Sequence, residues 1–322
     1  MKTNAILRGG ACALLIIFAS VSRAQDYPTK PVRLVAPFST GAMQILAHIF
    51  SENLAPLLGQ PVVVDYRPGA AGNLGMEIAA KAPPDGHTLA LVTSSHAIAP
   101  VLNPKVRYDL LKDFALVSFV ATVPNLVVVH PSLPVKTLKE LAQLARNNPG
   151  KLTYGSGGTG SFTHLTNELF RTLAKAEIVH VPYKGGSIAL TNILTGEVDM
   201  VVVTVPATLP FVTTGRLRAL AVLSPERLPQ LPNVPTSAQG GMPELVSVAW
   251  YGVVAPAGVR PDIVTRLNAE IAKIMKNAEV RQRLAKLGID PVGSTPAAFQ
   301  EFIRAEVTRW SRVIREARIQ IE

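Results

Sequence analysis

Apolar and polar positions alternate along this chain in two rhythms. Short runs of β-branched and apolar residues predict buried strands at residues 32–36, 62–64 and 88–93. Apolar residues that recur every three or four positions predict amphipathic helices between them, at residues 46–57 and 74–81. Because a strand, helix, strand succession pairs its strands in parallel, we expect an α/β layer here.

The middle of the chain repeats this succession. Apolar runs at 114–120 and 125–129 predict two strands, and we place a crossing between two lobes at Thr122 to Pro124, which separates them. The strands predicted beyond the crossing lie at residues 152–154, 178–181, 198–203 and 217–222. The helices that alternate with them lie at residues 137–147, 162–173, 187–194 and 207–213. The middle is therefore predicted to be an α/β unit of its own.

Residues 224–241 are rich in proline and glycine and lack periodicity, which is typical of a linker that crosses back. A strand is predicted at 248–254. Three amphipathic helices follow it, with apolar residues at helical spacing in 263–274, 280–287 and 299–314. Two connections between the lobes form a hinge. The expected domains are lobe 1, from residues 25–124 and 230–322, and lobe 2, residues 125–229.

Residues 1–24 do not fit the pattern of the rest. A positively charged start is followed by an apolar run at 11–21 that is too short to span a bilayer, and small residues precede a cleavage point after Ala24. We therefore expect a signal peptide, cleaved after Ala24, and a protein exported to the periplasm. The one cysteine, Cys12, lies in this segment, so the mature protein is expected to contain no disulfide.

The chain has 322 residues, with 32 Lys and Arg against 22 Asp and Glu and a formal net charge of +10. A single core rarely exceeds ~250–300 residues, which favours two lobes. Bases and acids are interspersed without a basic stripe, which argues against a nucleic-acid partner. The six histidines lack metal-ligand spacing, and no later apolar run reaches ~18 residues. We expect no metal, no cofactor and no transmembrane helix.

Two turns that contain glycine follow a predicted strand and open a predicted helix, one in each lobe. They are Pro37–Ala42 and Gly155–Ser161. A helix amino end offers unpaired N–H groups and a partial positive charge, and glycine lets a ligand approach the backbone. In open α/β sheets, ligands bind at the carboxyl ends of strands, where both turns are expected to lie. Each turn is a candidate anion site, or simply a tight turn capped by Ser and Thr.

The second turn also contains residues that could form a nucleophile and a base. Ser156 or Ser161 with His164 would suit a hydrolase, but the Gly-x-Ser-x-Gly spacing of a nucleophile elbow is missing. We therefore expect no enzyme activity and interpret His164 as a residue that packs against the loop or positions it. Tyr183 and Lys184 precede a later helix and could supply a wall and a cation to the cleft, or remain solvated.

Further motifs occur together over essentially the whole mature chain. They are Tyr27–Val32 with Pro37–Phe38, Gly59–Val64 with Arg67–Gly72, Pro84–Leu89, Gly155–Ser161 with His164–Leu165, Val181–Gly185, Leu231–Thr236, and Trp250–Gly252 with Ala255–Gly258. In this order they resemble the Bug-type extracytoplasmic solute receptors of tripartite tricarboxylate transporters.

The resemblance implies an α/β fold of the type II periplasmic binding protein kind, with a parallel or mixed sheet in each lobe and a hinge of two connections. Such a receptor closes on a small carboxylate and presents it to the membrane permease subunits of the transporter. The resemblance places the ligand between the first loops of the two lobes. The site residues expected from it and from the patterns above are Phe38, Ser39, Thr40, Gly41, Ala42, Gln44, Ser94, Ser156, Gly158, Thr159, Gly160, Ser161, His164, Tyr183 and Lys184.

The chain departs from this family at the first loop. Members usually have an Asp where this chain has Gln44, and a carboxylate there could pair with an ammonium group of the ligand. We therefore predict a mono- or dicarboxylate ligand without a cationic amine. Alternatively, the family's Asp is chiefly a helix N-cap, and Gln44 says little about the ligand.

The expected protein is a monomeric receptor for transport. A ligand sensor whose closed form docks on a sensor-kinase ectodomain is the alternative, and the sequence does not separate the two.

Overall fold

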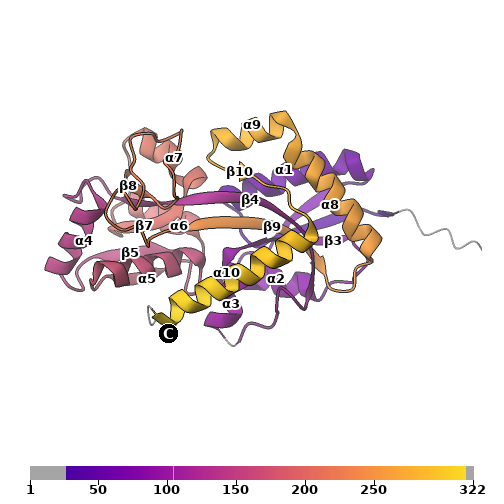
Figure 1. Ribbon diagram of the computed structural model, residues 1–322, viewed down its shortest axis with the longest axis horizontal. Helices are drawn as coiled ribbons and strands as arrows, with labels where there is room; N and C mark the ends of the chain where they lie inside the picture. Colours follow the sequence, from indigo (N-terminus) through magenta and orange to yellow (C-terminus); the bar gives the residue numbers. More distant parts are fainter. Residues whose placement is uncertain (1–26, 104, 317–322) are drawn as a thin grey trace, which may run out of the picture.

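The computed structural model describes residues 27–103 and 105–316. The predicted signal peptide, its cleavage point after Ala24, and Cys12 lie outside these residues. The described chain forms two α/β lobes joined by long strands (Figure 1). Within this part of the chain, no helix is long and apolar enough to cross a membrane.

Lobe 1 contains the following strands and helices. The strands are β1 (Val32–Ala36), β2 (Val62–Tyr66), β3 (Thr88–Thr93) and β10 (Asp290–Pro291), together with parts of β4 (Phe114–Val129) and β9 (Val248–Pro256). The helices are α1 (Gly41–Leu58), the 3₁₀ turn η1 (Ala70–Gly72), α2 (Asn73–Ala80), α3 (Ser94–Leu102), α8 (Pro261–Lys276), α9 (Ala278–Lys286) and α10 (Pro296–Glu316).

Lobe 2 has the same type of architecture. Its strands are β5 (Thr153–Ser156), β6 (Val179–Pro182), β7 (Met200–Thr204) and β8 (Arg218–Val222), with the second half of β4. Its helices are α4 (Leu138–Asn147), α5 (Phe162–Ala174), α6 (Gly186–Leu194) and α7 (Val205–Thr213). The strand order across both lobes is β2-β1-β3-β9-β4-β7-β5-β6, with β8 and β10 also paired to β4. Parallel pairs such as β1 with β3 and antiparallel pairs such as β3 with β9 make the sheet mixed, one of the two arrangements that the resemblance implies.

The central strands, such as β1, β3, β4 and β9, are buried on both faces, which explains their nearly continuous apolar runs. Leu34 belongs to the core on one face of the lobe 1 sheet, and its neighbour Val35 belongs to the core on the other face. Val127 and Val128 divide in the same way between the two cores of lobe 2. Alternate side chains of a strand point to opposite faces, so helices must cover each lobe on both sides.

The two strands that the sequence predicts at 114–120 and 125–129 form one continuous strand, β4, which passes from lobe 1 into lobe 2. β4 runs without a break through Thr122 to Pro124, pairing with β9 up to Pro124 and with β7 from Asn125 onward. Proline lacks the N–H that a ladder needs, which is why the pattern suggests a break. Pro124 is tolerated because it lies where β4 changes partners.

The packing of residues 231–247 favours a return crossing after residue 230, where the sequence analysis places the boundary. Leu231 belongs to one core of lobe 2 and Leu245 to the other, and Ser247 N–H donates to the carbonyl of Leu223 at 2.9 Å. Irregular backbone with buried leucines therefore follows lobe 2 up to the start of β9. We propose boundaries at residues 124–125 and 247–248, which this packing supports.

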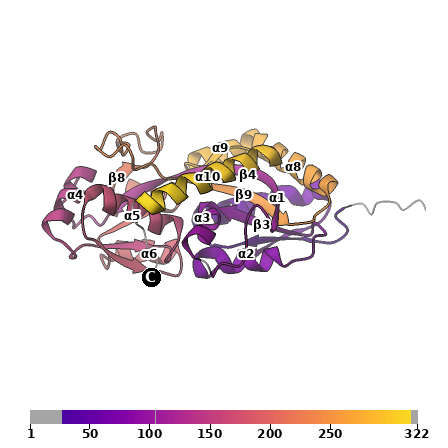
Figure 2. The same ribbon diagram turned by 60° about the horizontal axis from the view of Figure 1, so that its bottom comes forward.

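The longest helix of lobe 1, α10, extends across the junction toward lobe 2 (Figure 2). Phe299 near its start is packed in a lobe 1 core. Trp310 near its end contacts Phe162 of α5 edge to face, with ring centroids 5.0 Å apart. The first turn of α5 is therefore held by lobe 1 side chains.

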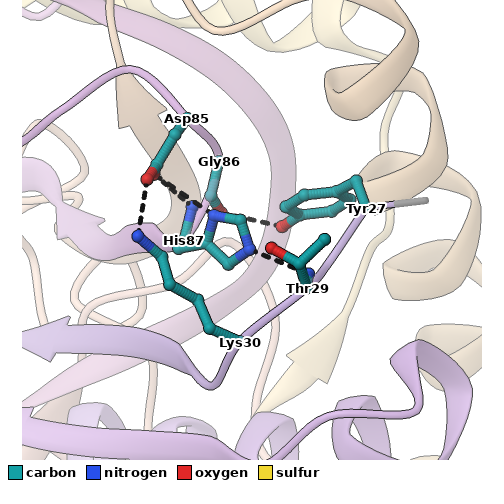
Figure 3. Close-up of polar contacts among 6 residues, drawn as sticks. All are labelled: Tyr27, Thr29, Lys30, Asp85, Gly86 and His87. Atoms are coloured by element: carbon teal, nitrogen blue, oxygen red, sulfur yellow. Dashed lines mark hydrogen bonds and ion pairs between the residues drawn. The ribbon is translucent and has the colours of Figure 1, made fainter. Parts of the chain in front are cut away.

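Two of the family motifs contact each other at the amino ends of the lobe 1 strands (Figure 3). Tyr27 Oη donates to the Gly86 carbonyl at 2.7 Å, and Thr29 N–H donates to His87 Nε2 at 3.1 Å. Lys30 Nζ forms an ion pair with Asp85 Oδ2 at 2.9 Å. These contacts fix the segment before β1 to the turn before β3, at the end of the sheet opposite the candidate site.

Candidate functional site

A cavity of about 250 Å³ lies between the lobes, at the carboxyl ends of β1, β3 and β7. Lobe 1 borders it with the loop after β1 and the start of α3, and lobe 2 borders it with the starts of α5, α6 and α7. Asn125 of β4 and Tyr251 of β9 complete the wall where the two lobes join. This is the location at which ligands bind in open α/β sheets.

Five helices begin at this cavity. The lining residues at or next to their first positions are Thr40 of α1, Thr93 of α3, Ser161 of α5, Gly186 of α6 and Thr204 of α7. Each helix start carries unpaired N–H groups and about half a positive elementary charge. Their convergence creates an electropositive cavity without a basic side chain, which suits an anion.

Three of these helix starts lack a side-chain cap. Thr40, Gly185 and Thr204, the N-cap residues of α1, α6 and α7, make no cap hydrogen bond among the described residues. By contrast, Ser161 accepts a hydrogen bond from His164 N–H and so caps α5. A bound carboxylate could satisfy the open N–H groups of the three uncapped helices.

No charged side chain lines the cavity within the described chain. The ring of His96 stacks on that of the lining residue Phe38 with ring centroids 5.8 Å apart, and its Nδ1 accepts from Thr93 N–H at 3.0 Å. Burial lowers the pKa of His96 to about 3, so the ring is neutral at pH 7. Burial also raises the pKa of the lining Tyr251 well above its ordinary value.

In the glycine-rich loop of lobe 2, residues 155–161, several backbone N–H groups already donate hydrogen bonds to nearby side chains. Gly157 N–H donates to Thr163 Oγ1 and Gly158 N–H to Ser156 Oγ, both at 3.1 Å. Gly160 N–H donates to His164 Nδ1, also at 3.1 Å. The loop therefore acts less as a backbone anion cradle than the sequence suggests, because these donors are already paired.

The structure reveals a serine and histidine pair that the spacing does not indicate. Ser156 Oγ lies 2.7 Å from His180 Nε2, because β5 and β6 pair in parallel. Ser156 is 1% exposed and does not line the cavity, so its hydroxyl is not placed to attack a ligand there. The pair supports the loop.

The structure places only some of the predicted site residues on the cavity. Those that line it are Phe38, Thr40, Gly41, Ala42 and Ser161. Those that do not line it are Ser39, Gln44, Ser94, Ser156, Gly158, Thr159, Gly160, His164, Tyr183 and Lys184.

The residues outside the cavity have identifiable reasons for their positions. Ser39, Gln44 and Lys184 are exposed to solvent. The hydroxyl of Ser94 is buried and accepts a hydrogen bond from Trp250 N–H. His164 is buried, and its Nδ1 accepts a hydrogen bond from Gly160 N–H of the loop.

Sequence reasoning missed several lining residues, among them Ser95, Asn125, Ser187 and Thr204. Ser95 lies in α3, a helix that the sequence pattern does not predict after the strand at 88–93. Thr204 could have been found, since proline in the first turn after it marks a helix start. Asn125 had no local signal.

The comparisons with known proteins show the family of this chain. Residues 46–319 match the model of the tripartite tricarboxylate transporter family receptor. The chain belongs to this receptor family. The family and the solved relatives are binding proteins rather than enzymes.

Individual relatives are similar to this receptor over almost its whole length. Protein BugT of Bordetella pertussis is 38% identical over 303 residues, which cover 93% of each chain. The structure of R. palustris Rpa4515 with adipate is 37% identical, with a TM-score of 0.88, and covers 92% of this chain and 99% of that one. MatC of Rhodopseudomonas palustris with bound malate is 31% identical, with a TM-score of 0.85, and covers 89% and 100%.

Proposed function

We propose that this receptor captures a small organic carboxylate between its lobes in the periplasm and delivers it to the permease of a tripartite tricarboxylate transporter. The observation that carries the proposal is the convergence of five helix amino ends on one cavity without a charged side chain among the described lining residues. Relatives solved with adipate and with malate support a carboxylate ligand.

The ligand we propose is a mono- or dicarboxylate without a cationic amine. Gln44 does not support this choice, because it is exposed and lies outside the cavity. The support comes from the wall itself, where the described residues offer no carboxylate to pair with an ammonium group. Five helix amino ends would also repel a cation.

The remaining parts of the proposal concern the whole protein. The signal peptide is cleaved after Ala24, the mature receptor is a monomer, and the ligand-binding residues include Phe38, Thr40, Gly41, Ala42 and Ser161. The neutral residues Ser95 and Ser187 join this set. Transport of radiolabelled ligand by the permease with and without the receptor tests the delivery step.

A thermal-shift panel tests ligand capture. The probes are adipate, glutarate, succinate and malate, with glutamate and aspartate as matched amino acids, in a buffer free of carboxylates. A ligand that binds only the folded state raises the melting temperature, and we expect this for at least one dicarboxylate and for neither amino acid. Dimethyl adipate, which lacks the charges, is the control and should produce no shift.

Two outcomes would contradict the proposal. No shift with any carboxylate at millimolar concentration would remove the capture function, and larger shifts with the amino acids than with their matched diacids would remove the ligand class.

A further inference from the structure

One cationic residue lies directly beside the cavity without lining it. Of all Lys, Arg, Asp and Glu residues in the sequence, only Lys184 is within three positions of a described residue that lines the cavity. That lining residue is Gly186, the first residue of α6. Lys184 is exposed to solvent. It forms no ion pair with another described residue, whereas Lys30 and Lys273 each pair with a carboxylate. No described carboxylate therefore neutralises its charge.

Backbone contacts hold the segment that carries Lys184 against the cavity wall. Tyr183 N–H donates to the Ser156 carbonyl at 3.2 Å, and the Gly186 nitrogen would lie 3.4 Å from a Cβ atom built on Gly157, which also lines the cavity. Two residue steps span at most about 7.6 Å between Cα atoms, which limits the distance from Lys184 to Gly186. Charges interact over ~30 Å at about 0.01 M ionic strength, so the ammonium group acts on an anion in the cavity in any side-chain rotamer.

We propose that Lys184 steers the anionic ligand to the cavity and so favours dianions over monoanions, without contacting the bound ligand. This rests on the proposed carboxylate capture and adds the residue that controls its rate. The partial charge of a helix start acts within about one turn, whereas a full charge beside a cavity attracts an anion from farther away. The helix starts therefore hold the bound carboxylate, and Lys184 accelerates its approach.

The position of Lys184 determines which rate constant it changes. A solvated charge beside the cavity attracts a ligand at the entrance about as strongly as a ligand inside, so it raises the association rate constant, kon, and leaves the dissociation rate constant, koff, nearly unchanged. The attraction also grows with ligand charge. At about 10 Å in water, one unit charge changes the rate about twofold for a monoanion and about fourfold for a dianion.

Stopped-flow binding of adipate and of its monomethyl ester tests the proposal, because the two ligands share a carbon chain and differ by one charge. Tryptophan fluorescence reports binding, since Trp310 contacts the lining residue Phe162. In Lys184→Gln at about 0.01 M ionic strength, we expect kon to fall roughly three- to fourfold for adipate and at most about twofold for the ester. The Kd from calorimetry should rise by the same factors, and about 0.5 M NaCl should remove both effects.

Further variants separate the charge of Lys184 from its shape and from the net charge of the protein. Lys184→Arg keeps the charge and should keep the natural kon, whereas Lys184→Glu reverses it and should lower kon for adipate roughly tenfold. Lys151→Gln is the matched control. Lys151 is an exposed lysine of the same lobe, but it precedes β5 and lies ~20 Å along the strand from Gly157. Its loss should lower kon less than about 1.5-fold.

The outcomes separate steering from capture. An unchanged kon in Lys184→Gln, an equal loss in Lys151→Gln, or equal losses for adipate and its ester would overturn steering and leave carboxylate capture intact. A change mainly in koff would also overturn it, because Lys184 would then contact the bound ligand. If adipate does not bind, the diacid with the largest thermal shift and its monomethyl ester replace the pair. Failure of every carboxylate to bind would instead remove the proposed function itself.

Discussion

Gly72 occupies a position where even a methyl group has no room. Its φ angle is 90°, and a Cβ atom built there would lie 2.5 Å from His96 Nε2 and 2.8 Å from the Phe38 ring. Phe38 lines the cavity, so the turn that contains Gly72 supports one wall of the site from behind. Ala70 and Ala71 precede it with positive φ angles of 49° and 55°, which L-residues adopt rarely.

Gly72→Ala should therefore destabilise the protein by about 2–4 kcal/mol, because backbone strain adds to a clash with the buried ring of His96 and the partly buried ring of Phe38. Gly150→Ala is the control, since its φ is 68° and its added Cβ would meet nothing within 4 Å. Its free energy of unfolding should fall by only about 1 kcal/mol, the cost of placing an alanine in the left-handed backbone region. Urea unfolding measures both, and equal losses in the two variants would mean that the clash is relieved.

His164 connects protonation to the shape of the lobe 2 loop. Its Nδ1 accepts the Gly160 N–H, so this nitrogen must carry no proton, and its ring stacks on His180 with centroids 4.1 Å apart. Burial lowers the pKa of His164 despite an opposing effect of Glu168, and burial followed by the charge of His164 lowers the pKa of His180 to about 4. A lowered histidine pKa means that the proton prefers the opened loop or the unfolded chain.

The stabilising contribution of this pair is thus present above the ordinary histidine pKa of 6.5 and is lost as the pH falls from 6.5 toward 4. We expect ligand affinity to fall roughly three- to tenfold more between pH 7 and pH 5 in the natural protein than in His164→Asn, whose side-chain oxygen can still accept the Gly160 N–H. Comparing the two proteins cancels the titration of the ligand. His130→Asn is the control in the same lobe, and an identical pH profile of all three proteins would exclude His164 as the sensitive group.

At the scale of elements, the helix starts have a double role. Some helices, among them α4, α5 and α9, close their first turn with a side-chain cap, as α4 does when Thr137 accepts from Glu140 N–H at 3.1 Å. The N-cap of α1, Thr40, makes no such hydrogen bond within the described residues and lies on the cavity. An open helix start at a binding site leaves donors for the ligand at the expense of helix stability.

Thr40→Asp should change stability and affinity in opposite directions. An Asp N-cap pairs with the open N–H groups and the helix dipole, which should stabilise the fold by about 0.5–1 kcal/mol. The same carboxylate occupies the anion site, so binding of the best diacid should weaken at least roughly 100-fold. Chemical unfolding and calorimetry measure the two effects. Thr137→Asp, far from the cavity, should leave affinity unchanged, and unchanged affinity in Thr40→Asp as well would mean that α1 does not contact the ligand.

At the scale of the molecule, the lobes meet across the cavity. A Cβ atom on Gly41 of lobe 1 would lie 3.8 Å from the Cβ of Ala207 of lobe 2. The same two lobes are joined by β4 and β9, a connection that permits hinge motion. Both lobes contribute to the cavity wall, so we expect the lobes to move apart and together as the ligand leaves and enters.

We therefore expect small-angle scattering to show a smaller radius of gyration when the receptor is saturated with its carboxylate. The double variant Gly41→Cys and Ala207→Cys provides a reference, because the predicted Cβ separation suits a disulfide. Oxidised and without ligand, it should scatter like the saturated natural protein, and reduction should restore the open form. Superimposable curves of the natural protein with and without ligand would contradict hinge closure.

Much of this protein is determined by local pattern. The continuous apolar runs identify strands buried on both faces, the three- and four-residue spacing identifies the helices, and glycine at the turns after β1 and β5 indicates where backbone can approach a ligand. Five predicted site residues, Phe38, Thr40, Gly41, Ala42 and Ser161, line the cavity because they occupy strand-to-helix turns, whose position in an α/β lobe follows from the succession of elements.

Tertiary structure alone decided which chemistry these turns perform. The sequence shows glycines in 155–161 but not that the amides of Gly157, Gly158 and Gly160 are already paired by side chains. Nor does it show that the side chain of Asn125 donates to Ser247 Oγ, 122 residues away, and that its Oδ1 finds no partner among the described residues. Such facts depend on the register and packing of distant segments, since a hydrogen bond is made or lost over a few tenths of an ångström that no sequence spacing specifies.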